Sequence, residues 1–204
     1  MWLEHYGWRK DIAGDDDFRK ACLAVQHYRK DRKNGLLLIG EVGCGKTLLA
    51  RILFNNTKWR RHSEDTIDHR VWVDCTDSLE VNRLASDEDA RQLGLVKPAG
   101  GDDDWLRPIL FIDDLGRERP VNNYGTQVSL TGAAIQRFYN SWEQPYDERF
   151  SGPPTIGNHL VVTTNLDLGA LHERYGTRVM DRMLAMCAIV RFTGGSKRKA
   201  VELS

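Results

Sequence analysis

The sequence predicts an α/β fold in which a parallel five-stranded sheet carries helices on both faces. Two observations lead to this prediction. Short apolar segments alternate along the chain with longer segments of helical periodicity. In addition, a glycine-rich stretch, LIGEVGCGKT, joins the first apolar segment to a helical one. Strands that alternate with helices form parallel sheets whose faces are both covered.

The composition is that of a compact protein with no membrane segment. The chain has 204 residues, of which 41% are hydrophobic and 28% are charged. Lys+Arg and Asp+Glu number 29 each, so a nucleic-acid surface would need local charge. The four cysteines show neither disulfide nor zinc spacing, which is typical of reduced thiols in the cytosol. No signal sequence or long apolar run is present, so we expect a cytoplasmic location.

The first elements surround the glycine-rich stretch. Residues 15–33 predict a helix, because aspartates favour its start and an apolar face follows, made of Phe18, Cys22, Val25 and Tyr28. Residues 36–39 predict a short buried strand. Residues 46–57 predict a helix whose inward side chains are Leu48, Leu49, Ile52 and Leu53.

The rest of the chain continues the alternation. Further apolar strands are predicted at 71–75, 109–112, 159–164 and 188–192. The main helical segments between them are 128–143 and 170–186. An acidic, Gly-rich stretch and a Pro-rich stretch predict loops at 86–104 and 144–158.

The glycine-rich stretch fits the phosphate-binding pattern G-x-x-x-x-G-K-[ST] in full, with a strand before it and a helix after it. Glycines let the backbone N–H groups point at phosphate oxygens, and the helix start adds positive potential. We expect Lys46 to reach the β- and γ-phosphates of ATP, or the β-phosphate of ADP, and the Thr47 hydroxyl to bind Mg²⁺. The predicted nucleotide-binding residues are Gly40, Glu41, Val42, Gly43, Cys44, Gly45, Lys46, Thr47 and Leu48.

Polar residues also end two later strands. In ILFIDD, Asp113 is predicted to hold Mg²⁺ and Asp114 to polarise the attacking water. In VVTTNL, Asn165 follows an apolar strand. Because the carboxyl ends of parallel strands converge on the ligand, Asn165 is predicted to orient the water or to touch the γ-phosphate.

Two stretches stay open on their chemistry alone. In YGTRVMDRML, Arg178 and Arg182 share a helix face, and the apolar side is Met180, Met183, Leu184 and Met186. Each arginine could serve a site or pair at the surface with Asp181 or Glu173. The basic cluster in FTGGSKRK, residues 192–199, could equally be a solvated tail.

Together, GEVGCGKT, FIDDLG, TTNLDL, YGTRVMDRM and RFTGGSKR resemble AAA+ ATPases, specifically the DnaC/DnaI helicase-loader group, which includes the IstB transposition ATPases. The resemblance implies a P-loop NTPase core and an ATPase that acts as an oligomer. It implies Walker A at Lys46 and Thr47, Walker B at Asp113 and Asp114, and sensor 1 at Asn165. Asp114 stands where most members have glutamate, which implies slow turnover.

The resemblance also gives roles to the arginines. It implies that Arg182 is the arginine finger that reaches a neighbouring subunit's site, that Arg178 is a second such arginine, and that Arg198 is the sensor 2 arginine. It implies one ATPase domain at 15–204 after an N-terminal segment at 1–14, without a separate C-terminal lid domain. Loaders of this group usually carry a larger N-terminal region that grips the helicase, so we expect either a fragment or another contact surface.

Single-stranded DNA is the nucleic acid that the resemblance implies. The KWRRH stretch sets an indole among cations and provides the candidate contacts Lys58, Trp59, Arg60 and Arg61. Alternatively, these cations favour the end of the preceding helix. Arg117 and Arg119 follow Walker B and could link DNA to the nucleotide, and residues 77–95 are another candidate surface.

The leading hypothesis is a helicase-loader ATPase that oligomerises on single-stranded DNA and acts on a replicative helicase. The first alternative is an IstB-like ATPase that assists a transposase. The second is an adaptor that binds ATP as a switch and hardly hydrolyses it. A P-loop kinase would leave the TTNL and YGTRVMDR stretches unexplained.

Overall fold

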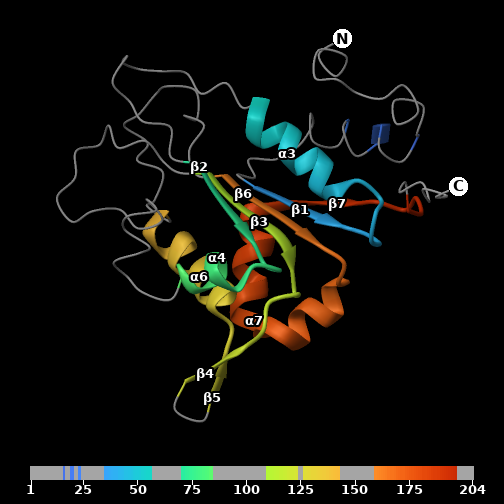
Figure 1. Cartoon of the computed structure of the whole chain (residues 1–204). Helices are drawn as coiled ribbons and strands as arrows, with labels where there is room; N and C mark the ends of the chain where they lie inside the picture. The colour runs from blue at the N-terminus through green and yellow to red at the C-terminus, as the bar shows by residue number, and fades with distance from the viewer. Residues whose placement is uncertain are drawn as a thin grey trace, which may run out of the picture.

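The computed structural model describes residues 16, 19, 20, 23, 35–56, 70–84, 109–123, 126–142 and 159–196 (Figure 1). The main strands in these ranges are β1 (Gly35–Ile39), β2 (Arg70–Asp74), β3 (Ile109–Leu115), β6 (His159–Thr164) and β7 (Cys187–Arg191). Two short strands are β4 (Val121–Asn123) and β5 (Thr126–Val128). The helices are α3 (Lys46–Asn56), α4 (Ser78–Asn82), α6 (Leu130–Trp142) and α7 (Leu168–Met186).

The main sheet is parallel and has five strands, as the sequence predicts. The structure shows their order in the sheet to be β2-β3-β6-β1-β7. β1, in the interior of the sheet, is buried along its whole length, whereas β3 and β6 carry polar side chains toward their carboxyl ends. Since every strand runs the same way, all carboxyl ends lie at one edge of the sheet. This edge receives the glycine-rich loop after β1, the aspartates of β3 and the residue that follows β6.

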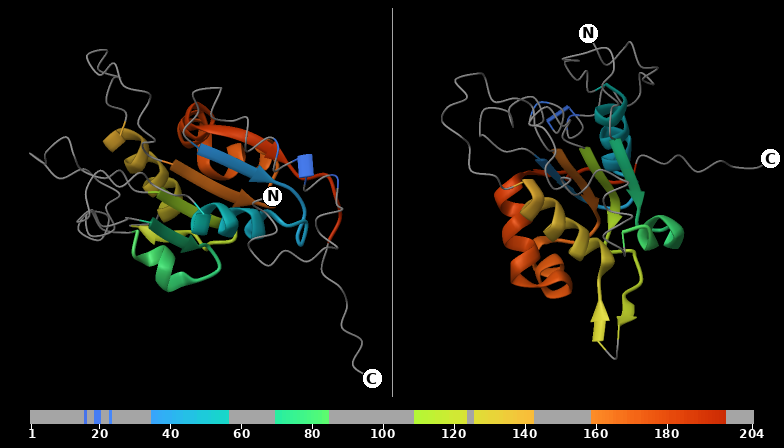
Figure 2. Two further views of the ribbon diagram at one scale, coloured as in Figure 1. Left: turned by 90° about the horizontal axis from the view of Figure 1, so that it is seen from above. Right: turned by 90° about the vertical axis from the view of Figure 1, so that its left-hand side faces the viewer.

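Helices cover both faces of this sheet, which confirms the second part of the predicted architecture. Figure 2 shows α3 on one face and α6 and α7 on the other. Successive strand residues alternate between the two faces. Leu37, Leu110 and Leu160 belong to the core cluster shared with α6 and α7, whereas their buried neighbours Leu36, Phe111 and Val161 lie outside that cluster.

One side chain of α3 departs from its prediction. Leu48 was expected to face inward, but it is 39% exposed. The buried hydrophobic side chains described in α3 are Leu49, Ala50 and Ile52, so Leu48 lies outside the buried face, and the side chain of Leu53 lies outside those that the structure describes. In α7, Met180 and Met183 are buried as expected, while Leu184 is exposed.

Three elements were not expected from the sequence. α4 is short, but Asp77 caps it by accepting a hydrogen bond from the Leu79 N–H at 2.8 Å. Asp77 and Glu80 have the spacing of a capping box, a signal that could have revealed α4. β4 and β5 pair antiparallel in a ribbon that projects from the sheet (Figure 1).

Some predicted elements lie wholly or partly outside the described residues. Of the predicted helix at 15–33, only Asp16, Arg19, Lys20 and Leu23 are described, and all four are helical. The two predicted loops, 86–104 and 144–158, fall entirely in the ranges 85–108 and 143–158, which are not described. No helix in the described ranges is long and apolar enough to cross a membrane.

Candidate functional site

The glycine-rich loop runs from Gly40 to the start of α3 and needs glycine at specific positions. Gly43 and Gly45 have φ angles of 85° and 106°, which favour residues without a Cβ. A Cβ on Gly43 would lie 2.3 Å from the Ser196 hydroxyl oxygen, and one on Gly40 would lie 2.8 Å from the Phe192 Cβ. The loop therefore packs directly against the segment that follows β7.

We expect Gly43→Ala to lower the free energy of unfolding by about 1–3 kcal/mol, because the φ angle of 85° is unfavourable for alanine and the new methyl group would meet Ser196. Urea unfolding of the two proteins measures the difference. Gly195→Ala is a matched control, since a Cβ there meets nothing within 4 Å. Equal losses in the two variants would contradict the packing described here.

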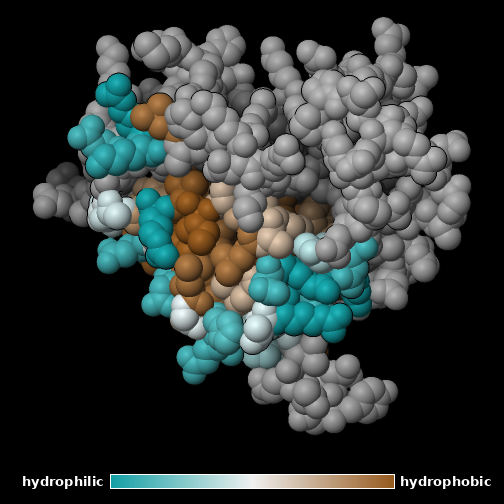
Figure 3. All heavy atoms as spheres, turned by 180° about the vertical axis from the view of Figure 1, so that it is seen from behind, coloured by the Kyte–Doolittle hydropathy of each residue, from teal (hydrophilic) through white to brown (hydrophobic). Residues whose placement is uncertain are grey.

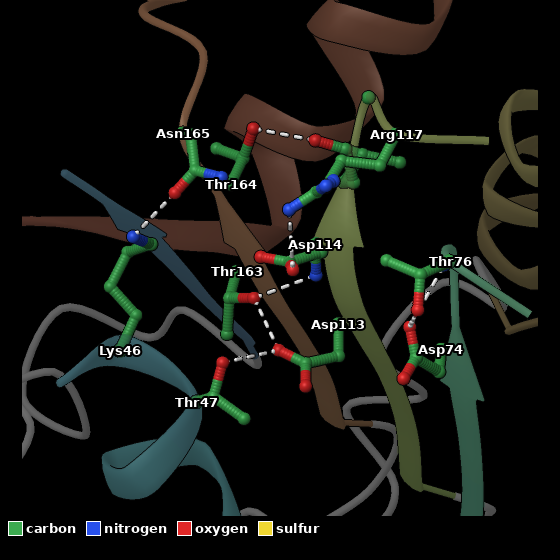
Figure 4. Close-up of polar contacts among 12 residues, drawn as sticks. Lys46, Thr47, Asp74, Thr76, Asp113, Asp114, Arg117, Thr163, Thr164 and Asn165 are labelled. Carbon is green, nitrogen blue, oxygen red and sulfur yellow. Dashed lines mark hydrogen bonds and ion pairs between the residues drawn. The ribbon is translucent and has the colours of Figure 1, made fainter. Parts of the chain in front are cut away.

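Lys46 links the loop to a distant part of the chain. Its side chain is buried, and Nζ donates to the carbonyl oxygens of Gly40 (2.8 Å) and Glu41 (2.7 Å). It also donates to Oδ1 of Asn165 at 2.8 Å, across 119 positions of sequence (Figure 4). An ammonium group has three donors, so all three are satisfied. A buried cation held by oxygen atoms beside an N–H-rich loop fits a phosphate ligand.

Asp113 is the centre of a second cluster. Its Oδ1 accepts hydrogen bonds from the Thr47 hydroxyl at 2.9 Å and the Thr163 hydroxyl at 2.6 Å. Burial raises the pKa of this carboxyl, and the two hydroxyl donors oppose that shift. A threonine hydroxyl beside a carboxylate supplies the oxygen ligands that Mg²⁺ prefers, so these residues fit that ion.

The raised pKa makes stability depend on pH. The folded protein holds the Asp113 proton more tightly than the unfolded chain does, so this carboxyl favours folding most at low pH and less as pH rises through its folded pKa. We therefore expect metal-free Asp113→Asn to melt above wild type near neutral pH, with the gap shrinking as pH falls toward about 4. Melting curves measured in a pH series with a chelator check this. An Asp113→Asn variant that melts below wild type near neutral pH would contradict this prediction. We also expect the variant to lose Mg²⁺-dependent ATP turnover.

Asp114 adopts an unusual backbone conformation beside Asp113. Its φ angle is 55°, and its N–H donates to the Thr163 hydroxyl at 2.9 Å. The strand continues to Leu115, three residues beyond its predicted end, but its register with β6 shifts between Ile112 and Leu115. The Asp114 side chain is 28% exposed and has the guanidinium of Arg117 at 3.8 Å. A partly exposed carboxylate here can accept a proton from water at the sheet edge.

Several predicted residues lie on the surface of this site. Glu41, Val42, Leu48 and Arg117 are exposed. Cys44 is buried under the loop, with its sulfur 3.7 Å from Lys46 Nζ. The predicted contacts Lys58, Trp59, Arg60, Arg61 and Arg198 lie outside the described residues.

The α7 arginines lie in a separate place. Arg182 donates to Oδ1 of Asn140 and stacks over the Tyr139 ring at 4.7 Å, both on α6. These contacts replace the surface pairing with Asp181 or Glu173 that the sequence left open. Arg178 is exposed on the same part of α7, after a kink at Gly176. The described contacts of Arg182 are therefore on α6 and not at the glycine-rich loop.

Thr163 and Glu118 were not singled out from the sequence. Thr163 lies next to the carboxyl end of β6, beside Asp113. Its position near the end of a predicted strand was the signal that could have placed it in the site. Glu118 is buried, although it sits between two arginines in a polar stretch. Nothing in the local pattern predicts its burial.

The fold and this site define an ATPase domain of the P-loop class. Residues 36–183 match the family model described as "ATPase family associated with various cellular activities (AAA)", and the chain belongs to this family. The match runs from β1 into α7 and so contains the contacts of Lys46, Thr47, Asp113 and Asn165 described above.

Three solved structures are also similar to the chain. One is described only as an ATPase, with 14% identity, a TM-score of 0.46, and coverage of 80% of this chain and 67% of that one. Domain III of the Thermotoga maritima replication initiation protein DnaA has 15% identity, a TM-score of 0.47 and coverages of 88% and 63%. The Aeropyrum pernix ORC1 protein, solved in complex with DNA, has 16% identity, a TM-score of 0.48 and coverages of 88% and 44%. The chain therefore spans less than two thirds of the last two.

Proposed function

We propose that this protein hydrolyses ATP as an oligomer on single-stranded DNA and acts as a DnaC-like helicase loader. The observation that carries the ATPase part is the meeting of three motifs at one sheet edge. Lys46 contacts Asn165, and Thr47 contacts Asp113, although these pairs are separated by 119 and 66 positions in the sequence. The loader part is supported by the resemblance of the five sequence stretches to that group.

Each residue has a task in the proposed reaction. The backbone N–H groups of the loop and the Lys46 ammonium would bind the phosphates, with Lys46 exchanging its loop carbonyls for phosphate oxygens. Thr47 and Asp113 would hold Mg²⁺, which neutralises charge on the phosphate oxygens. Asp114 would accept a proton from the attacking water, and Asn165, released by Lys46, would orient that water.

The remaining charge in the transition state would be met by a neighbouring subunit. An arginine supplied in trans makes hydrolysis depend on assembly. Arg182 is our candidate, because α6 holds it partly exposed and apart from the protein's own loop. Arg178 and Arg198 are proposed as a second trans arginine and a cis nucleotide contact.

An apolar surface near α7 supports self-association. Figure 3, which views the molecule from behind, shows hydrophobic residues gathered at the centre of that face. Figures 1 and 2 place β7 and the last part of α7 on this side. These elements contribute the exposed Leu184 and Ile189. Such patches are typical of protein-contact surfaces.

The decisive experiment measures ATP hydrolysis against protein concentration, with and without single-stranded DNA. We expect turnover per subunit to rise steeply with concentration and to increase with DNA. Flat, negligible turnover with intact ATP binding would instead support the nucleotide-switch adaptor. An IstB-like helper would stimulate a transposase and not a replicative helicase, so adding each partner enzyme separates these two functions.

The DNA part has its own prediction. We expect alanine at Lys58, Arg60 and Arg61 together to weaken DNA binding and to reduce the slope of log affinity against log salt by about 0.7 for each lost phosphate contact. Fluorescence anisotropy with a labelled single strand in a salt series measures this. Arg191→Ala removes an exposed charge at the end of β7, outside the candidate DNA surfaces, and serves as the control for changed total charge. An unchanged slope would remove the KWRRH stretch from the DNA surface.

A further inference from the structure

Glu118 is a buried carboxylate that the proposed reaction does not use. Its side chain is 1% exposed. One oxygen accepts a hydrogen bond from the Gly116 N–H at 2.9 Å, and the other accepts from the Ser129 hydroxyl at 3.2 Å and from the Tyr175 hydroxyl. Burying a carboxylate is unfavourable unless its oxygens are satisfied, and here hydrogen bonds from three separate elements satisfy them.

The first of these contacts controls the turn that carries Asp114. Asp114 and Gly116 both have positive φ angles, 55° and 102°, and the Glu118 carboxylate accepts a hydrogen bond from the Gly116 N–H. The Asp114 carbonyl accepts from the Arg117 N–H at 3.1 Å, which closes the turn. The position of the Asp114 carboxylate therefore depends on a turn that the buried Glu118 carboxylate stabilises through its hydrogen bond with the Gly116 N–H.

The second set of contacts lies at the kink of α7. Tyr175 immediately precedes Gly176, whose φ and ψ of 78° and 165° break the helix. Arg174 donates to the Glu118 carbonyl, and its Nε lies 3.9 Å from the Glu118 carboxylate. Arg178 and Arg182 lie in the part of α7 that follows this kink. Glu118 thus touches both the turn of Asp114 and the point where α7 changes direction.

We propose that Glu118 is a positioning residue that couples the Asp114 turn to the α7 segment carrying Arg178 and Arg182. This inference rests on the proposed function, because it assigns both ends of the coupling to the same reaction. A change in the nucleotide site reaches α7 through the Glu118 carboxylate, and the arginines presented to a neighbouring subunit move with it.

Three variants test the coupling within one protein. We expect Glu118→Gln and Tyr175→Phe each to lower kcat for ATP by about tenfold or more, while the affinity for a fluorescent ATP analogue stays unchanged. The double variant should lose no more than the more severe single variant, since both remove the same coupling. Ile135→Val is the control: Ile135 on α6 is equally buried, but its side chain is apolar and cannot hydrogen-bond to Glu118. It should lower the melting temperature and leave kcat unchanged.

Mixing subunits separates this inference from the proposed function. Arg182→Ala subunits keep their own Asp114 and lack only the arginine that they would give to a neighbour. Mixing them with Asp114→Asn subunits, which still carry Arg182, should therefore restore hydrolysis in the sites of the Arg182→Ala subunits. Glu118→Gln subunits should fail to do so, because their Arg182 is misplaced. Restoration by Glu118→Gln as complete as that by Asp114→Asn, or an unchanged kcat in both single variants, would overturn the coupling. If wild type itself does not hydrolyse ATP, the proposed function fails first and the coupling fails with it.

Discussion

Asp114→Asn is expected to lower kcat for ATP hydrolysis by about 10²–10⁴-fold and to leave ATP affinity intact. Asparagine has the size of aspartate but cannot accept the proton of the attacking water. It also tolerates the positive φ angle of 55° found at this position, so the turn should keep its shape. The Asp114 N–H that binds the Thr163 hydroxyl is a backbone group and is retained.

Steady-state hydrolysis and equilibrium binding of an ATP analogue measure the two parts of this prediction. Asp77→Asn is the matched control, because asparagine caps α4 as well as aspartate does and the described hydrogen bond of the Asp77 side chain is to the α4 backbone. Its kcat should equal that of wild type. A kcat for Asp114→Asn within the error of the control would remove Asp114 from the role of base.

Arg182→Ala should have a similar or larger effect, lowering kcat by about 10³–10⁵-fold without loss of ATP binding. The expected reason is that Arg182 stabilises negative charge on the transferred phosphoryl group in a neighbouring site. In the structure the guanidinium is held over Tyr139 and against Asn140, so it is positioned before any partner arrives. Pre-positioning lowers the entropy that binding must otherwise overcome.

The diagnostic property of this variant is rescue by other subunits. Adding Asp114→Asn protein, itself inactive, should restore hydrolysis to Arg182→Ala protein, since each supplies what the other lacks. Loss of ATP binding by Arg182→Ala alone would mean that the arginine acts on its own subunit's nucleotide. An Arg182→Ala protein that hydrolyses ATP as wild type does would show that the finger lies elsewhere.

Much of the site was predictable because its residues follow strands. Asp113 and Asn165 each follow an apolar run, and the glycine-rich loop with Lys46 and Thr47 follows another. Because the strands are parallel, their carboxyl ends meet at one edge of the sheet, which brings these three motifs together. The individual side-chain contacts at that edge of the sheet were less predictable. Lys46 could have faced solvent, and only packing brings its ammonium to Asn165. The contact of Ser196 with Gly43 likewise depends on where β7 lies beside β1.

Helix faces were predicted less accurately than strands. The exposure of Leu48 shows why: several positions of α3 are apolar, and the sequence does not say which of them meets the sheet. The short α4 and the β4–β5 ribbon have too few residues to show a clear period.

The sequence by itself determined the class of fold, the order of the five main strands along the chain, and the residue types that we propose bind phosphate and Mg²⁺. These follow from local patterns: apolar runs, glycine spacing and strand-end carboxylates. Only the tertiary structure decided that Glu118 is buried, that Arg182 rests on α6, and which face α3 turns to the sheet. The physical reason is that burial and charge pairing arise between segments distant in sequence, where no local period records them.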